Sequence, residues 1–190
     1  MLQLVDGIAR PIRWVGHSLG GRLALELAYR APGRTAAVAL LDPALGLDPA
    51  EAHAYAEEER AGREYASREE ALAGRRDVAQ LAPEAILEEE LAEHLVATPD
   101  GRFRFRFAPS AVVAMYGELA GAPPAAPAGE RLPHVLLVAG AESAFVTDDH
   151  VRLLRGSLGA ALEVVTVPGG HIVLWDSFAE SAGAIGRFLA

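Results

Sequence analysis

The chain has 190 residues, enough for about one domain, and 51% of them are hydrophobic, so it can bury a sizeable core. Its formal net charge of −9 argues against nucleic acid or an anionic membrane as a partner. Cysteine is absent, which excludes disulfides, thiolate nucleophiles and cysteine-bound metals, and we expect a cytoplasmic location. The sequence predicts neither a membrane-spanning segment nor a signal peptide.

The first quarter of the chain predicts a strand, a helix and a second strand. Residues 12–15 are rich in strand-forming residues and end at a glycine, which indicates a short buried strand. Apolar residues recur every four positions across 19–31, and Pro32 and Gly33 follow, so a helix should end there. Residues 36–41 are continuously apolar, which is typical of a parallel strand covered on both faces.

The next part of the chain is charged and predicted to be helical. Asp48 is a suitable N-cap for one helix, and the sequence at 67–70 is a capping box for a second. A third helix opens at Pro83 and is predicted to run to about Val96.

The end of this charged block changes character. Residues 102–107 alternate arginine and phenylalanine, which indicates an extended segment with one apolar side. Residues 109–119 predict a short helix, and the alanine- and proline-rich stretch 121–129 predicts a linker.

The sheet pattern then resumes. Residues 135–139 and 162–167 predict two more strands, with helices over 147–158 and 177–189. Strands that alternate with helices indicate an α/β fold with a parallel sheet. The predicted division is a core of residues 1–47 and 130–190 with a helical lid insertion and linker at residues 48–129.

The most informative motif is Gly-His-Ser-Leu-Gly at residues 16–20, between the first predicted strand and helix. In this context Gly-x-Ser-x-Gly forms a sharp turn that lifts the serine out of the sheet. We expect Gly16 and Gly20 to be required because a side chain at either position would clash. The motif predicts that Ser18 is a nucleophile; the alternative is a serine-containing turn without a function.

A serine nucleophile needs a base to accept its proton. Of the six histidines, His171 fits best because it follows the last predicted strand directly, on the Gly169–Gly170 turn. It should emerge at the carboxyl end of the sheet, where Ser18 also emerges and where ligands of open α/β sheets bind. The alternative is a loop histidine that makes only a local hydrogen bond.

The third member of such a site should orient His171 and stabilise its charged form. Two carboxylates are candidates. Asp42 ends the second predicted strand, and Glu142 follows the third. Each also has a structural interpretation, since Asp42 can cap a turn with Pro43 and Glu142 can simply be exposed.

Three motifs together resemble the α/β-hydrolase superfamily. Residues 16–21 resemble its nucleophile elbow, residues 169–171 resemble its histidine loop, and residues 41–43 before a helical insertion resemble its sixth strand leading into a cap. The order nucleophile, acid, histidine also fits. The resemblance implies the C-terminal part of an α/β-hydrolase fold, with about four parallel strands flanked by helices, and a serine hydrolase of the esterase or lipase type.

The resemblance also bears on the acid and on the oxyanion. Many members carry the acid after strand seven in a Gly-x-x-Asp pattern, and that position here is Ser143. Other members carry it after strand six, which corresponds to Asp42, so Asp42 is the favoured acid and Glu142 the alternative. The backbone N–H of Leu19 is the expected oxyanion donor.

The family normally has four further strands before the elbow, and a loop among them supplies the second oxyanion donor. Because 17 residues precede Ser18, we expect these strands to be missing. Strand 12–15 would then be an exposed apolar edge that favours self-association. The missing strands leave one alternative to ester hydrolysis, an inactive or partner-dependent fragment. The versatility of the fold leaves a second, a non-catalytic binder of small molecules.

The expected partner is a small ester-like substrate, without a metal or cofactor. His17 is included among the substrate-binding candidates, although a side chain at this point of the elbow should point away from the substrate side. An apolar stripe in the insertion is the other candidate, and its plainer interpretation is packing of the lid on the sheet. This stripe consists of Phe103, Phe105, Phe107, Met115 and Tyr116.

Overall fold

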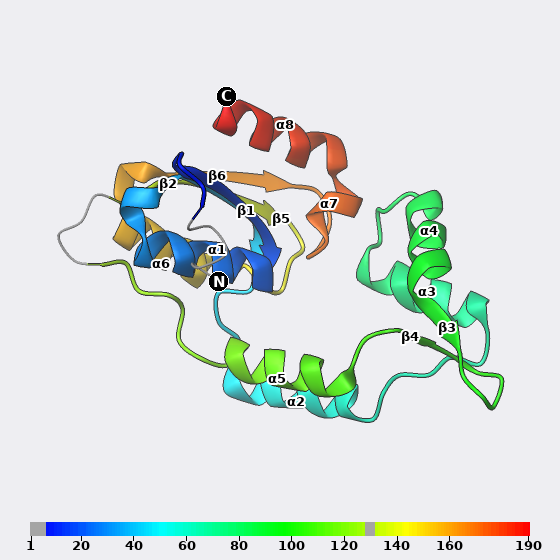
Figure 1. Ribbon diagram of the computed structural model, residues 1–190. Coiled ribbons are helices and arrows are strands. Elements are labelled where there is room, and N and C mark those ends of the chain that lie inside the picture. Colours follow the sequence, from blue (N-terminus) through cyan, green and yellow to red (C-terminus); the bar gives the residue numbers. More distant parts are fainter. Residues whose placement is uncertain (1–6, 128–131) are drawn as a thin grey trace.

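The computed structural model describes residues 7–127 and 132–190. Residues 1–6 and 130–131 of the predicted core, and residues 128–129 of the predicted linker, lie outside the described residues. The core is a four-stranded sheet of order β1-β2-β5-β6, in which all neighbours are parallel (Figure 1). This confirms the predicted α/β class. The strands are β1 (Ile12–Ser18), β2 (Thr35–Pro43), β5 (His134–Gly140) and β6 (Leu162–Val167).

Helices cover both faces of the sheet (Figure 1). On one face lie α1 (Leu19–Arg30) and α6 (Asp148–Leu158), and on the other lie α7 (Val173–Asp176) and α8 (Phe178–Leu189). Short 3₁₀ turns at Pro32–Arg34 and Gly159–Ala161 precede β2 and β6.

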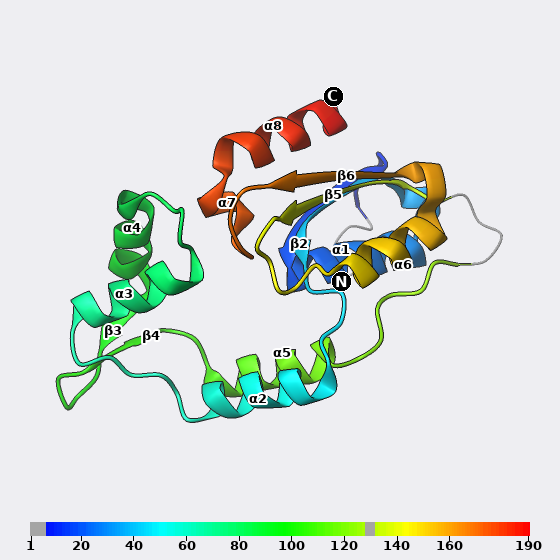
Figure 2. The same ribbon diagram turned by 180° about the vertical axis from the view of Figure 1, so that it is seen from behind.

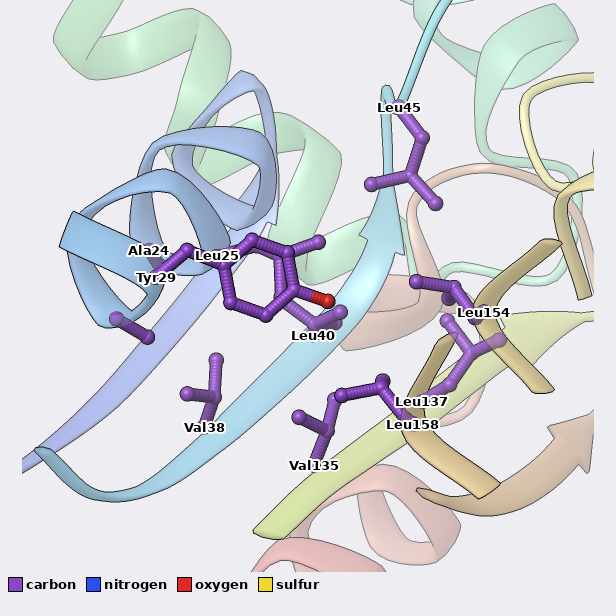
Figure 3. Close-up of a cluster of buried hydrophobic side chains, with 11 residues drawn as sticks. Ala24, Leu25, Tyr29, Val38, Leu40, Leu45, Val135, Leu137, Leu154 and Leu158 are labelled. Carbon is purple, nitrogen blue, oxygen red and sulfur yellow. The ribbon is translucent and has the colours of Figure 1, made fainter. Parts of the chain in front are cut away.

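Strand β2 explains why the sequence shows a continuous apolar run. Val38 and Leu40 face α1 and α6 in the cluster drawn in Figure 3, whereas Ala39 and Leu41 face α7 and α8. Helices on both faces bury the side chains of β2 from Ala37 to Pro43. The two clusters are the main source of hydrophobic stabilisation in the core.

Between β2 and β5 the chain forms a separate group of elements (Figure 2). Helices α2 (Pro49–Arg60) and α5 (Pro109–Leu119) lie side by side. Helices α3 (Arg68–Val78) and α4 (Glu84–His94), with the hairpin of β3 (Leu95–Ala97) and β4 (Phe103–Phe105), form a second cluster. Trp175 of α7 packs with Ala79, Ala82 and Leu87 of that cluster, so the insertion contacts the core at the carboxyl end of the sheet.

The predicted end of the third helix is wrong. Helix α4 ends at His94, and residues 95–97 form a strand instead of a last helical turn. They pair antiparallel with β4, through a turn in which Gly101 has a φ of +82°. The pairing supplies backbone partners to β4, a tertiary interaction that a helical periodicity does not reveal.

Strand β1 is the edge of the sheet and is only partly covered. Among the described residues it pairs with β2 alone, and Val15 is 50% exposed while Trp14 packs against the cluster under α1. In the described parts of the chain, none of the helices has the length and apolar character needed to cross a membrane.

Candidate active site

The turn between β1 and α1 places Ser18 at the carboxyl edge of the sheet. Ser18 has a φ of +53°, a conformation that costs a non-glycine residue free energy and is typical of functional turns. A Cβ at Gly16 would lie 2.2 Å from the carbonyl oxygen of Gly20, so this glycine is required. The same expectation is wrong for Gly20, whose Cβ would meet nothing within 4 Å; the second required glycine is Gly21, packed against Pro43.

Three of the predicted residues lie in one hydrogen-bonded line. The Nε2 atom of His171 lies 2.8 Å from the Oγ of Ser18, and its Nδ1 lies 2.7 Å from Oδ1 of Asp42. A carboxylate only accepts, so Nδ1 carries the proton and donates to Asp42. Nε2 is then free to accept the hydroxyl proton of Ser18, which is the relation a nucleophile needs to its base.

Asp42 is held more firmly than any other carboxylate near the site. It is 0% exposed and has a φ of +40° at the end of β2. Its Oδ2 accepts a hydrogen bond from the N–H of Gly140 at 2.8 Å, and its Oδ1 accepts one from the hydroxyl of Ser143 at 2.5 Å. A buried carboxylate with three donors is fully satisfied and has one orientation.

The alternative acid, Glu142, lies elsewhere. Its side chain is exposed, and no hydrogen bond in the described residues joins it to His171. Its backbone N–H binds the carbonyl of Gly169 at 3.0 Å instead. Ser143, which occupies the family's other acid position, supports Asp42 through its hydroxyl, a role the sequence analysis missed.

The loop that carries His171 is fixed against the end of β5. A Cβ at Gly140 would lie 2.0 Å from the carbonyl oxygen of Gly170, so the two backbones touch. The carboxylate of Asp176 accepts hydrogen bonds from the N–H of Gly170 at 2.9 Å and, across to the insertion, from the N–H of Leu81 at 3.0 Å. His171 is thus held by contacts of its loop backbone as well as by its ring.

Two further side chains, both unrecognised by the sequence analysis in this role, contact His171. The ring of Phe145 stacks on the imidazole with centroids 4.0 Å apart. The Nε2 of His17 lies 2.8 Å from the carbonyl oxygen of His171. Burial lowers the pKa of His17, an effect that the hydrogen bond to the carbonyl partly opposes.

A cavity of about 230 Å³ opens beside His171. Its lining comes from the end of α3, the loop after β5 and the histidine loop. The lining residues are Asp77, Val78, Gln80, Glu142, Ala144, Phe145, Gly170, His171 and Asp176. None of the apolar stripe predicted to bind substrate contributes to this wall.

The structure places that stripe within the insertion. Phe103 and Phe105 pack around the buried Tyr65, where the ring of Phe105 meets the ring of Tyr65 edge-on. Tyr116 on α5 stacks on Tyr55 of α2, with ring centroids 5.4 Å apart.

Phe107 and Met115 lie on different parts of the insertion. Phe107 is exposed and lines a separate hollow of about 240 Å³ with Arg75 and His94. Met115 is half-buried on α5.

The predicted oxyanion donor lies at the first residue of α1. Leu19 begins the helix directly after Ser18, and the first N–H groups of a helix have no partner inside it. These groups also carry the positive end of the helix dipole. A negatively charged oxygen of a molecule bound beside Ser18 would therefore be stabilised by the backbone N–H groups at the start of α1.

Comparisons with known proteins agree with this architecture. The model of the alpha/beta hydrolase fold family matches residues 7–178. A curated relative, lipase LipV of Mycobacterium tuberculosis, is 36% identical over 176 residues, which cover 92% of this chain and 67% of the relative.

Solved structures share the fold at lower identity. E-2-(acetamidomethylene)succinate hydrolase superposes with a TM-score of 0.77 at 21% identity, over 99% of this chain and 70% of the other. An esterase from Mycobacterium tuberculosis superposes with a TM-score of 0.58 at 23% identity, over 99% and 64%. The chain belongs to the alpha/beta hydrolase fold family.

Proposed function

We propose that this protein hydrolyses a carboxylic ester through an acyl-enzyme formed on Ser18. The observation that carries the proposal is the continuous line of hydrogen bonds from Asp42 through His171 to Ser18. The name of the lipase that is 36% identical supports an ester as the substrate. The same line of contacts would serve a thioester, so the acyl bond is the common element.

The reaction begins at the hydroxyl of Ser18. Its proton passes to Nε2 of His171 while Oγ attacks the ester carbonyl carbon, and Asp42 stabilises the imidazolium. The N–H of Leu19 donates to the resulting oxyanion. The tetrahedral intermediate collapses, the bond to the alcohol oxygen breaks, and His171 protonates the leaving alkoxide.

Water completes the cycle. It approaches the acyl-enzyme beside His171, which takes one proton while the water oxygen attacks the acyl carbon. Collapse of this second intermediate breaks the bond to Ser18 Oγ, which recovers its proton from His171, and the carboxylic acid leaves.

In this proposal the insertion acts as a lid over the site. Val78, at the end of α3, and Phe145 form apolar parts of the cavity wall beside His171. We assign them contact with the acyl or alcohol group. Residues 48–129 would then shape substrate choice by closing this side of the site, because Leu81 and Trp175 tie the insertion to the histidine loop.

A fluorophosphonate probe tests the nucleophile. The wild-type protein should be labelled at Ser18 and should hydrolyse a short p-nitrophenyl ester. The variant Ser18→Ala should fold with an unchanged melting temperature and lose both signals. Absence of labelling in the folded wild type, at every concentration tried, would overturn the proposal.

A second candidate is a protein that acts only when paired through β1. The observation behind it is the edge position of β1 and the 50% exposure of Val15, since unpaired strand edges bind other strands. Light scattering across a range of concentrations tests it. Under this candidate, labelling of Ser18 should rise with the dimer fraction, and Val15→Lys should abolish both; labelling of a stable monomer would exclude it.

A further inference from the structure

His17 occupies an unusual place beside the base. It is the residue directly before Ser18, yet its side chain crosses to the histidine loop and meets the backbone of His171. The distance from its Nε2 to the carbonyl oxygen of His171 is 2.8 Å. A carbonyl only accepts, so Nε2 of His17 carries a proton and donates it to this contact.

The other bonds to the loop reach different peptide groups. Asp176 accepts from the N–H of Gly170, and the hydroxyl of Ser177 donates to the carbonyl of Pro168 at 2.8 Å. In the described parts of the chain, the carbonyl of His171 itself accepts only from His17. The backbone of the base residue is therefore joined directly to the nucleophile turn.

The charge state of His17 suits this position. Its ring lies 4.8 Å from the ring of His171, at an interplanar angle of 38°. Burial lowers the pKa of His17, and repulsion from His171 acts in the same direction. His17 thus stays neutral near neutral pH, and it donates without adding a positive charge that would oppose the imidazolium form of His171.

We propose that His17 is a positioning residue that sets the distance between Ser18 and His171 by holding the carbonyl of His171. This role replaces the substrate contact expected from the sequence, and it rests on the proposed function of Ser18. Reacting groups must be held closely, because a displacement of about 1 Å costs as much as about 100-fold in rate.

Three substitutions separate the donor from the shape of the ring. His17→Phe keeps a planar ring and removes the donor. His17→Gln places an amide N–H at about the position of Nε2, whereas His17→Asn places it at about that of Nδ1, too short to reach the carbonyl. For each variant we would measure the second-order rate of fluorophosphonate labelling, kcat and KM for a p-nitrophenyl ester, and the melting temperature.

The expected pattern is specific. His17→Phe and His17→Asn should label about 10- to 100-fold more slowly and lose kcat with KM nearly unchanged, and His17→Gln should recover most of the rate. Ser177→Ala is the matched control, because it removes a bond to the same loop at Pro168. It should lower the melting temperature while labelling stays within about twofold of wild type.

Other outcomes overturn the inference. Labelling of folded His17→Phe at the wild-type rate, failure of His17→Gln to exceed His17→Asn, or an equal loss in Ser177→Ala would show that the contact serves the loop's stability only. These outcomes differ from failure of the proposed function, in which the wild type itself remains unlabelled.

Discussion

The carboxyl edge of the sheet and the insertion use polar groups in opposite ways. At the sheet edge, Asp42 is fully buried and each of its contacts comes from a different loop or strand. In the insertion, ion pairs such as Arg102 and Glu64 are exposed to solvent, with side chains 42% and 41% exposed. The first arrangement fixes one geometry, whereas the second contributes little to stability.

One ion pair of the insertion departs from this rule. Arg75 on α3 pairs with Glu90 on α4, and both side chains are largely buried. The guanidinium of Arg75 also lies over the rings of Phe105 and Trp175, at 5.1 and 5.6 Å from their centroids. The place where the insertion touches the histidine loop is thus built like the sheet edge, which suggests where substitutions in the insertion will affect activity.

The largest effect should come from Asp42→Asn. The amide keeps the shape of the carboxylate but favours the wrong tautomer of His171, so kcat should fall by about 10⁴-fold. Glu142→Gln is the matched control and should stay within about twofold of wild type. A large loss in Glu142→Gln with a small one in Asp42→Asn would make Glu142 the acid.

The next prediction compares a buried position of the core with an exposed position on its surface. Leu137→Ala in β5 should lower the free energy of unfolding by about 2–5 kcal/mol, because this side chain is fully buried between β2 and α6. Leu153→Ala, at an exposed position of α6, should change it by less than about 0.5 kcal/mol. Urea denaturation measures both, and equal losses would contradict the assigned core.

Ser143→Ala removes one donor from buried Asp42. We expect a rise in the free energy of activation, a fall in the free energy of unfolding, or both, by about 1–3 kcal/mol, because a lone pair of the carboxylate becomes unsatisfied. Ser143→Thr keeps the hydroxyl and should retain most of the activity. Steady-state kinetics with urea denaturation would show the split, and an Ala variant indistinguishable from wild type would remove Ser143 from the network.

Acidification should destabilise the fold through His17. The pKa of His17 is lowered, chiefly by burial, so below the ordinary value of 6.5 the unfolded chain binds protons that the folded chain does not. This contribution to stability is complete above that value and is lost as pH falls through the lower pKa. Urea denaturation between neutral and acid pH should show that the free energy of unfolding depends less on pH in His17→Gln. An unchanged slope would contradict a neutral His17.

The smallest effect is expected in the exposed pairs of the insertion. A double-mutant cycle on Arg102 and Glu64 should give a coupling energy below about 1 kcal/mol that falls further with salt. The same cycle on Arg75 and Glu90 should give a larger value. Equal couplings would remove the distinction drawn between the two kinds of pair.

The centre of the sheet was predictable because β2 and β5 are buried on both faces. Residues 36–41 and 135–139 have the continuous apolar runs that such strands need, and Asp42–Pro43 and Gly140 mark their ends. The short strand at 95–97 was not predictable, since its partner at 103–105 and not its own periodicity determines its conformation.

The arrangement of the candidate site was predictable where it depends on a motif, and not where it depends on packing. The residues Ser18 and His171 follow from the order of turns along the chain. The choice of acid between Asp42 and Glu142 remained open, because the sequence does not reveal which carboxylate the loops enclose. The contacts made by Ser143 and Phe145 arise from the path of the loop after β5, which a linear pattern does not contain.

The most direct test of the account is capture of the acyl-enzyme. The protein would be mixed with p-nitrophenyl acetate, quenched in acid within the first turnover and digested for peptide mass spectrometry. The account predicts one acetyl group on Ser18, and none at any position in Ser18→Ala. Ester hydrolysis without an acetyl group on Ser18, or with the group on another residue, would contradict it.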